Sequence, residues 1–485
     1  MPRRPTACSR LRMDSRSRSC RESRGVAVLL AAATLLIVAG GARAQHRSGG
    51  YAFRLFWAAP EGDARSLVRG PRGRLWAGCG DGTVRVLEDR SGDGKADYVQ
   101  TFASRVWSPH GISFRIRGTA LDVFVAHTTT RYGGASRITR FVDTDKDDRF
   151  DEAYTVISHM PPGAHQTNNL AIDPTGKWLW FSQGATADKS PGGGALVGKV
   201  APDARDVPWG DPRIQIVANG LRNAWGLAFH PNGALFATDN TRDDLGDATP
   251  PDELNLIRAG RHYGFPDVAG IPPKGHPSEP PVGLLGVHGS ANGLAFDDGH
   301  LMSGSRHQVF IAEWGSWTGS PGLTAGTRIV RAQLHRDARG RWHFEAHDLI
   351  RNCGRPLDVA IGRDGALYFT VQTSAPGWTE GVWRGAPASG VTVRLEGQPR
   401  PGCKIEVAVR APGHEGSRYR LSLRDEKTES SVRTGTLAGA LGRATGTIQI
   451  PGDSVGRRLR VVCQVLHPET GAIVATAPEL VVTVF

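Results

Sequence analysis

Short apolar strands on either side of a tight turn recur along this chain. In residues 225–240, apolar and polar positions alternate before and after Pro231-Asn232-Gly233, where glycine supplies the positive φ that the turn requires. Such a unit cannot bury both faces of its sheet alone, so several copies must stack against one another. The same strand–turn–strand pattern occurs six times, in residues 66–80, 109–127, 168–184, 225–240, 291–315 and 356–371.

Radial stacking of six units closes a ring that leaves only short strand edges exposed. We therefore predict an all-β fold with a six-bladed β-propeller over residues 50–386. The alternative is a two-sheet sandwich with coincidental repeats, and the regular strand spacing favours the propeller. The composition, with 62 glycines and 7% aromatic residues, agrees with a turn-rich β protein.

The pattern changes near residues 384–387. Beyond this point, the segment 388–485 contains short alternating strands between turn clusters, without the blade pattern. It predicts a small β-sandwich that is immunoglobulin-like in size. We find no catalytic constellation in it. It either docks the protein to a partner, to the envelope or to a polysaccharide, or it only caps the propeller.

Residues 1–44 have the pattern of a targeting segment. Arginines precede an apolar run over residues 26–38, and small residues flank a cleavage site after Ala44. The run is shorter than the ~20 residues of a membrane span, so we predict a signal peptide and export to the periplasm or the exterior. An uncleaved N-terminal anchor is the alternative, and Met13 is an alternative start.

Removal of this segment changes the charge balance. The whole chain has a formal charge of +12, but the chain without residues 1–44 has 50 basic and 45 acidic residues. No basic cluster is interleaved with aromatic residues, so we expect no nucleic-acid partner.

Four cysteines remain after residue 44, and an oxidising compartment permits disulfides between them. A Cys79–Cys353 pair would tie the first blade to the sixth and close the ring. A Cys403–Cys463 pair would lie within the C-terminal segment. Buried free thiols are the alternative for all four.

Two acidic loops have the spacing of calcium-binding loops. The first offers oxygen ligands at positions 1, 3, 5 and 9 with Gly94 at position 6, whereas the second has Asp148 in place of that glycine. Crowded carboxylates repel one another without a hard cation, so we predict calcium, with more support in the first loop. Solvated hairpin tips are the alternative. The predicted ligands are Asp89, Ser91, Asp93 and Asp97 in the first loop and Asp143, Asp145, Asp147 and Asp151 in the second.

Polar residues stand just before blade strands, where a propeller forms a site at the mouth of its channel. His165 precedes the third copy, Arg222 and Asn223 precede the fourth, His288 precedes the fifth and Arg355 precedes the sixth. Equivalent positions converge toward the axis, so we expect these side chains to share a cavity. Histidine accepts protons near neutral pH and arginine pairs with carboxylates, which suits oxidation of an alcohol beside an anionic cofactor. Taken singly, each residue also fits a structural role.

Six segments follow one another along the chain: "HQTNNLAIDPTGKWLWFSQG", "NGLRNAWGLAFHPNGALFATDNTRDDLGD", "PPDELNLIRAGRHYGFP", "LGVHGSANGLAF", "FIAEWGSWTGSP" and "CGRPLDVAIGRDGALYFT". In this order they resemble the glucose and sorbosone dehydrogenase family, and the sorbosone branch most closely. The resemblance spans about residues 66–385 and implies an exported quinoprotein whose propeller uses pyrroloquinoline quinone (PQQ) and calcium.

The resemblance also implies roles for individual residues. His165 matches the base that removes the substrate hydroxyl proton while hydride passes to the quinone. Arg222 and Asn223 match an arginine–asparagine pair beside the cofactor, where the positive charge stabilises the reduced quinone. Arg355 resembles an arginine that pairs with a cofactor carboxylate, and His288 joins these residues as a cofactor contact.

Some features depart from the family pattern. Residues 240–253 correspond to the loop that holds the catalytic calcium, but they lack the Gly-Pro form of that loop, so its ligands are not assigned. Trp314 stands where relatives commonly have histidine, and we find no counterpart of the cofactor-binding lysine.

Together these features predict an oxidoreductase for a small sugar-like alcohol or aldehyde. It would pass electrons to a separate acceptor, because the chain has no CxxCH haem motif. The alternative is a non-redox calcium-containing propeller, either a lactone hydrolase or a carbohydrate-binding envelope protein.

Overall fold

The fold is built almost wholly from β-strands, in agreement with the glycine-rich, turn-rich sequence. Among the residues that the structure describes, two short 3₁₀ turns interrupt the strands, η1 (Pro71–Gly73) and η2 (Asp243–Leu245). No helix in the described ranges is both long and apolar enough to cross a lipid bilayer. The computed structural model describes residues 46–48, 51–59, 63–131, 133–246, 250–297, 308–316, 326–387, 392–396, 402, 404–410, 418–424, 429–436, 443–450, 458–466, 473–476 and 480–483. The predicted signal peptide therefore lies outside the described residues.

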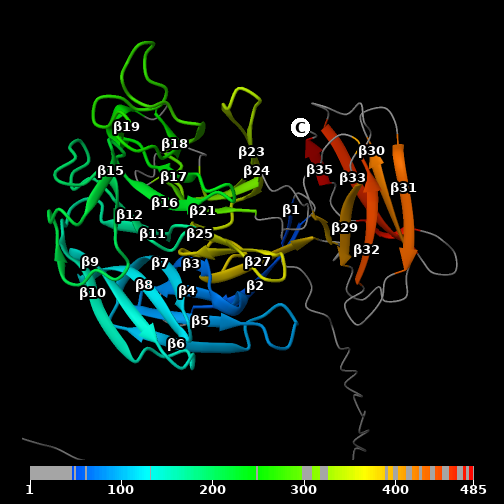
Figure 1. Ribbon diagram of the computed structural model, residues 1–485, viewed down its shortest axis with the longest axis horizontal. Helices are drawn as coiled ribbons and strands as arrows, with labels where there is room; N and C mark the ends of the chain where they lie inside the picture. The colour runs from blue at the N-terminus through cyan, green and yellow to red at the C-terminus, as the bar shows by residue number, and fades with distance from the viewer. Residues whose placement is uncertain are drawn as a thin grey trace, which may run out of the picture. The chain divides into compact units, whose positions relative to one another are not determined.

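Six sheets form the blades of a propeller, and each blade starts at its innermost strand (Figure 1). Blade 1 contains β3 (Ala64–Arg69), β4 (Leu75–Cys79), β5 (Thr83–Glu88) and β6 (Tyr98–Ser104). Blade 2 contains β7 (Trp107–Arg117), β8 (Ala120–Thr130), β9 (Gly133–Asp143), β10 (Glu152–Met160) and β14 (Val207–Pro208). Blade 3 contains β11 (Thr167–Ile172), β12 (Leu179–Gln183), β13 (Leu196–Val200), β15 (Gln215–Asn219) and β19 (Arg261–His262).

The second half of the ring repeats this order, and the last blade also includes strands from the start of the described chain. Blade 4 contains β16 (Ala224–Phe229), β17 (Leu235–Asp239), β18 (Pro251–Leu256) and β20 (Gly283–Val287). Blade 5 contains β21 (Ala291–Phe296), β22 (Gln308–Glu313), β23 (Arg328–Arg336) and β24 (Trp342–Arg351). Blade 6 contains β25 (Pro356–Ile361), β26 (Leu367–Val371), β27 (Gly381–Pro387), β2 (Tyr51–Ala58) and β1 (His46–Ser48).

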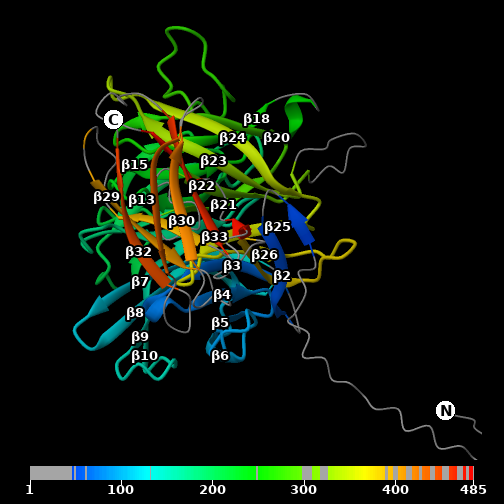
Figure 2. The ribbon, with the colours of Figure 1, turned by 90° about the vertical axis from the view of Figure 1, so that its right-hand side faces the viewer.

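Strand pairing closes the ring. β2 pairs antiparallel with β27, with Phe53 opposite Gly385 and Leu55 opposite Trp383. Figures 1 and 2 show the blue strand β2 beside the yellow strands of blade 6. The innermost strands β3, β7, β11, β16, β21 and β25 contact one another in sequence, and β25 contacts β3. The predicted six-bladed propeller is confirmed.

The predicted disulfide across the ring is wrong. Cys79 and Cys353 are both buried free thiols. The Cys353 Sγ donates a hydrogen bond to the Thr327 carbonyl at 3.4 Å, and burial raises the pKa of Cys79 to about 12. These thiols pack as small apolar residues within two separate core clusters, and the β2–β27 pairing closes the ring without a disulfide.

The blades pack face to face, so their inner strands are covered on both sides. Every residue of β22, β25 and β26 is buried. The Trp76 ring of blade 1 packs edge-on against Phe102 of the same blade at 4.8 Å and against Phe114 of blade 2 at 5.0 Å between ring centroids. A strand that is covered on both sides therefore carries apolar residues on both faces and does not strictly alternate apolar with polar residues.

Glycines allow the innermost strands to approach one another. A Cβ added at Gly111 in β7 would lie 2.6 Å from the Asn168 carbonyl in β11. A Cβ at Gly226 in β16 would lie 2.5 Å from the Asn292 carbonyl in β21. The glycine that recurs in "HGISF", "WGLAF" and "NGLAF" is thus explained by the convergence of backbones at the axis.

The C-terminal segment forms two antiparallel sheets, and the immunoglobulin-like sandwich with its boundary at residue 388 stays a prediction. Cys463 in this segment is a buried free thiol, and Cys403, its predicted partner, lies outside the described residues. One sheet contains β28 (Thr392–Glu396), β29 (Lys404–Arg410) and β32 (Arg443–Gln449). The other contains β31 (Glu429–Thr436), β30 (Arg418–Arg424), β33 (Arg458–Leu466), β34 (Ile473–Thr476) and β35 (Leu480–Thr483).

The glycine at the axis gives a direct test of ring packing. Gly226→Ala should lower the free energy of unfolding by about 1–3 kcal/mol, because its Cβ would press on the Asn292 carbonyl and the Leu294 side chain. Gly118→Asn is the control, since Gly118 has open space around it and a φ of 57°, which asparagine adopts readily. Chemical denaturation measures both. Equal stability of the Gly226→Ala and wild-type proteins would contradict the close approach.

Candidate active site at the propeller axis

A polar pocket of about 600 Å³ lies where the innermost strands begin. All six blades contribute to it, through Arg65 in β3, His110 in β7, Asn168 in β11, Trp225 in β16, Asn292 in β21 and Leu357 in β25. The remaining lining residues are Gly163, Ala164, His165, Gln166, Asp188, Arg222, Asn223, Asn240, Thr241, Asp243, Asp252, His288, Ser290, Trp314 and Gln372.

Four predicted site residues meet in this pocket. His165, Arg222, Asn223 and His288 all line it, although they precede three different blades. The sequence-based expectation that strand-end positions converge on one cavity therefore holds for these four residues. Their individual roles stay predictions.

Arg355, the fifth predicted site residue, is not among the residues that line the pocket. Its guanidinium carbon is 3.9 Å from the centroid of the Trp314 ring, and its Nη1 donates to the Ser316 carbonyl at 3.4 Å. Trp314, which does line the pocket, donates from Nε1 to the Gln372 Oε1 at 2.7 Å. Arg355 thus stacks on the tryptophan ring through a cation–π contact, and its predicted contact with a cofactor carboxylate stays a prediction.

His165 is held by its backbone and leaves one ring nitrogen without a partner. Its N–H donates to the Ala185 carbonyl at 3.1 Å, and its Nε2 is buried with no hydrogen-bond partner. Burial and, to a smaller extent, the Arg222 charge lower the pKa of His165 to about 4, while Asp188 opposes this shift. The ring is therefore neutral at physiological pH and can accept a proton.

Arg222 is almost fully buried and is engaged on every side. It forms ion pairs with Asp188 and, at 2.9 Å, with Asp243, and its Nη1 donates to the Asn240 carbonyl at 3.1 Å. Its backbone N–H donates to the Asp239 carboxylate at 3.1 Å. These contacts fix the plane of the guanidinium, so Arg222 is a preorganised charge.

A chain of amides continues from Arg222 across the pocket wall. Asn168 Nδ2 donates to Asn223 Oδ1 at 2.8 Å, and Asn223 Nδ2 donates to Asn240 Oδ1 at 3.3 Å. Asn240 Nδ2 donates to the Ala291 carbonyl at 2.6 Å in blade 5. The amides therefore link three neighbouring blades and hold Asn223 in place.

The structure adds residues that the sequence analysis did not select. His110 lines the pocket beside Gln166, and burial together with the Arg65 charge lowers its pKa to about 4. Asp252 accepts backbone hydrogen bonds from Thr241 at 3.1 Å and Ala291 at 2.8 Å, and burial raises its pKa to about 7. The shared "HG" dipeptide at His110 and at His288 was a signal that could have identified His110.

The first acidic loop uses its carboxylates to support its own turns. Asp89 accepts hydrogen bonds from the N–H groups of Gly92 at 2.6 Å and Gly94 at 2.7 Å. Asp97 accepts from the N–H groups of Arg90 and Ser91, both at 2.8 Å. Asp93 accepts from the Lys95 N–H at 2.8 Å. Calcium binding by Asp89, Ser91, Asp93 and Asp97 stays a prediction.

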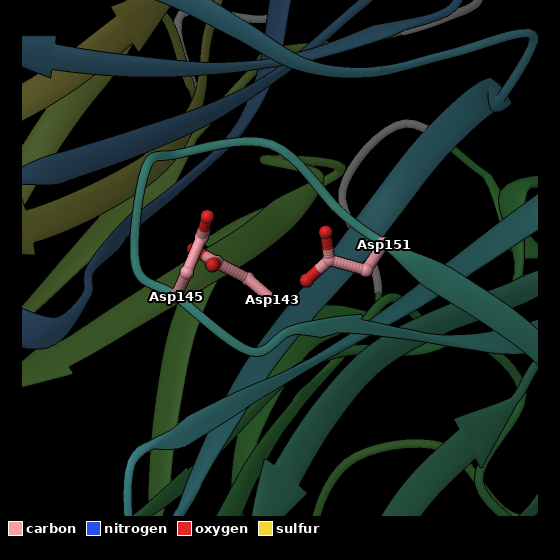
Figure 3. Close-up of side chains that lie close together, drawn as sticks. All are labelled: Asp143, Asp145 and Asp151. Carbon is pink, nitrogen blue, oxygen red and sulfur yellow. The ribbon is translucent and has the colours of Figure 1, made fainter.

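In the second loop, three carboxylates converge. Asp143, Asp145 and Asp151 offer oxygens that all lie within 4.8 Å of one another, and Figure 3 shows them inside the curve of the loop. Asp147, the fourth predicted ligand, is outside this group and accepts the Arg149 N–H at 2.8 Å. Neither acidic loop lines the axial pocket.

A closed ring of six blades with a histidine, an arginine and amides at its axis defines the class of this protein: a six-bladed propeller with a polar axial pocket. The sequence profile described as "Glucose / Sorbosone dehydrogenase" matches residues 119–377, which is more than half of the chain. The chain belongs to the glucose/sorbosone dehydrogenase family.

Solved structures of similar fold include sugar dehydrogenases. The PQQ domain of pyranose dehydrogenase from Coprinopsis cinerea is 15% identical, with a TM-score of 0.58 over 70% of this chain and 96% of that one. A putative oxidoreductase (glucose dehydrogenase) from Thermus thermophilus is 22% identical, with a TM-score of 0.51 over 69% and 99%. The soluble aldose sugar dehydrogenase from Escherichia coli is 16% identical, with a TM-score of 0.51 over 70% and 99%. At these identities, the likeness shows the fold.

A curated relative covers a smaller part of the chain. An uncharacterized protein from Borreliella burgdorferi is 32% identical over 176 residues, which is 32% of this chain and 46% of that protein. The chain thus spans about half the length of this relative.

The proximity of Arg222 to His165 has a measurable consequence. Arg222→Gln should raise the pKa of His165, because it removes a positive charge that opposes protonation. It should leave His110 unchanged, whereas Arg65→Gln should raise the pKa of His110 and leave His165 unchanged. NMR titration of the ring protons measures both values. Identical His165 titration in the wild-type and Arg222→Gln proteins would contradict the shared pocket.

Proposed function

We propose that this protein is an exported quinoprotein that oxidises a sugar, or a sugar-derived alcohol or aldehyde, with PQQ and calcium. The supporting observation is the unpartnered Nε2 of His165 in the axial pocket, beside Arg222 from the next blade. A buried nitrogen without a partner is costly unless a ligand or a water satisfies it. Family membership makes a sugar hydroxyl the natural candidate.

The residues around the pocket fit PQQ, a planar quinone that carries carboxylates. A volume of about 600 Å³ is in the range of small-molecule sites. Arg222, Asn223 and His288 would contact its polar edge, and the indoles of Trp225 and Trp314 provide apolar ring surface. The sorbosone-type branch stays a prediction within this proposal.

The charge of the pocket supports the calcium proposal. Arg222 is paired with two carboxylates, Asp188 and Asp243, so the guanidinium brings no excess positive charge. An anionic cofactor would meet these two acids, and a hard cation beside them would offset the repulsion. Residues 240–253 would hold this ion, since Asn240, Asp243 and Asp252 of this stretch bring oxygens to the pocket.

The chemistry divides between the cofactor and the chain. When bound, PQQ supplies the acceptor for the hydride that leaves the substrate carbon. His165, neutral because burial lowers its pKa to about 4, accepts the hydroxyl proton at Nε2. Arg222, whose guanidinium is fixed by Asp188 and Asp243, would orient the cofactor, and the Asn168–Asn223 hydrogen bond keeps the neighbouring amide oriented.

The proposal also includes an electron acceptor, export and attachment to the envelope. Electrons would leave to a separate acceptor, because the chain has no CxxCH motif. Residues 1–44 would direct export to the periplasm or the exterior. The C-terminal sheets, or an uncleaved N-terminal segment, would attach the protein to the envelope.

Reconstitution tests the proposal. Purified protein given PQQ and CaCl₂ should show quinone absorbance and reduce a dye with at least one member of a panel of aldoses and sugar aldehydes. His165→Ala should keep the absorbance but lower kcat by about 10²–10⁴-fold, the usual contribution of a general base. His159→Ala is the matched control, because His159 is exposed and does not line the pocket.

The outcomes separate the dehydrogenase from its alternatives. Neither quinone absorbance nor dye reduction would refute the dehydrogenase. Hydrolysis of sugar lactones, or polysaccharide binding without turnover, would then favour the non-redox propeller. An unchanged kcat in His165→Ala, with the cofactor bound, would remove His165 as the base.

A further inference from the structure

The loop between β9 and β10 carries an acidic cluster with a buried, unsatisfied oxygen. Asp143 is completely buried, and its Oδ2 has no hydrogen-bond partner, while its Oδ1 accepts the Lys146 N–H at 2.6 Å. Asp145 and Asp151 bring their carboxylates within 4.8 Å of this group, as Figure 3 shows. A buried carboxylate oxygen without a donor, facing two further carboxylates, indicates a missing positive partner.

The dimensions of this cluster suit a calcium ion. Calcium binds oxygen ligands at about 2.3–2.6 Å, so oxygens that share one ion lie no more than about 5 Å apart. The spread of 4.8 Å in the cluster is within this limit. The candidate ligands are oxygens only, from positions 1, 3 and 9 of the loop, and calcium takes carbonyl and water oxygens in addition to carboxylates.

The same loop reaches across to the neighbouring blade. Asp148 adopts a φ of 72°, the left-handed conformation that Gly94 adopts in the first loop with a φ of 85°. Its carboxylate forms a buried bidentate ion pair with Arg74 and accepts a hydrogen bond from the Tyr98 hydroxyl at 2.9 Å. Arg74 precedes β4 and Tyr98 begins β6, so both partners belong to blade 1.

The first acidic loop contacts its neighbouring blade, blade 6, through backbone groups. It joins β5 to β6 in blade 1 and contacts β2 of blade 6, where Arg54 Nη1 donates to the Asp93 carbonyl at 2.9 Å. The Ala96 N–H donates to the Phe56 carbonyl at 2.9 Å. Both loops thus bridge to the preceding blade. Turn N–H groups donate to carboxylates in both loops, but the second loop also contains a buried carboxylate oxygen without a partner, Asp143 Oδ2.

We propose that Asp143, Asp145 and Asp151 bind one calcium ion, and that this ion holds the loop in the conformation in which Asp148 pairs with Arg74. Calcium then fastens blade 2 to blade 1 at the outer part of the ring. The site is separate from the axial pocket and does not depend on the proposed dehydrogenase activity, because none of these residues lines the pocket.

Calcium titration of the metal-free, PQQ-free protein tests the site. Isothermal calorimetry should find one calcium equivalent fewer in Asp143→Asn/Asp145→Asn than in the wild-type protein. The rise in Tm on adding CaCl₂ should be smaller in this variant than in the wild-type protein, by the part of the rise that this site contributes. Asp89→Asn/Asp93→Asn is the matched control and should retain that equivalent, and MgCl₂ alone should give a weaker shift. Equal stoichiometry and an equal Tm shift in Asp143→Asn/Asp145→Asn would overturn the proposal.

Hydrogen exchange of the wild-type protein tests the bridge without relying on a cluster variant. Calcium should slow amide exchange in residues 143–151 and also in residues 70–79 of blade 1. In Arg74→Met/Asp148→Asn, which removes both charges and leaves neither one buried alone, the slowing should be confined to residues 143–151. Absence of slowing in residues 143–151 of the wild-type protein would refute the site. Slowing in residues 70–79 of the double variant equal to that of the wild type would refute the bridge.

Discussion

The pairing of β2 with β27 is the constraint on which the rest of the molecule depends. It joins residues 51–58 to residues 381–387, so the two ends of the propeller segment share one sheet. Trp383 of β27 is completely buried and packs 4.4 Å from the Trp378 ring, while Phe53 of β2 lies 6.0 Å from the Phe369 ring. Only in a closed ring do all six innermost strands point their first residues at one axis, and only there does a pocket form.

At the axis, the blades are joined by hydrogen bonds as well as by packing. Thr238 donates to the Asn292 carbonyl at 2.5 Å between blades 4 and 5, and Ser66 donates to the Pro109 carbonyl at 3.1 Å between blades 1 and 2. The Asp358 carboxyl accepts the Leu67 N–H at 2.8 Å across the seam between blades 6 and 1. Innermost strands are sheet edges whose backbone groups need partners, and polar side chains of the next blade provide them. The polar residues near the axis therefore serve the fold as well as the site.

The sequence predicted the parts of this arrangement that are local. Alternation and turn glycines placed the blades, and the rule that strand ends converge placed His165, Arg222, Asn223 and His288 in one pocket. It missed features that depend on distant partners. Nothing in "YAFRLFWA" indicates that this strand completes the sixth blade, and so a disulfide was expected at a seam that strand pairing already closes.

The calcium loops show the same limit at the level of single residues. Gly94 made the first loop the better candidate, because glycine adopts a positive φ without strain. Asp148 adopts the same backbone region in the second loop and is held there by Arg74, which lies 74 residues earlier in the chain. The ion pair with Arg74 thus offsets the cost of a positive φ at Asp148. The residue spacing of a calcium-binding loop does not reveal such a distant partner. The second loop, and not the first, is where three carboxylates converge.

The axial pocket is a set of oriented donors and acceptors and not a strongly positive cavity. His110 and His165 are neutral because burial lowers the pKa of each to about 4, and Arg222 is matched by Asp188 and Asp243. A net positive charge would attract an anion over a Debye length of about 8 Å at physiological salt, but this pocket has no such excess charge. An anion must therefore be held by short contacts and by an accompanying cation. Such a site favours an anionic ligand that binds together with a cation. Binding of the proposed quinone and binding of the proposed calcium are therefore expected to depend on each other.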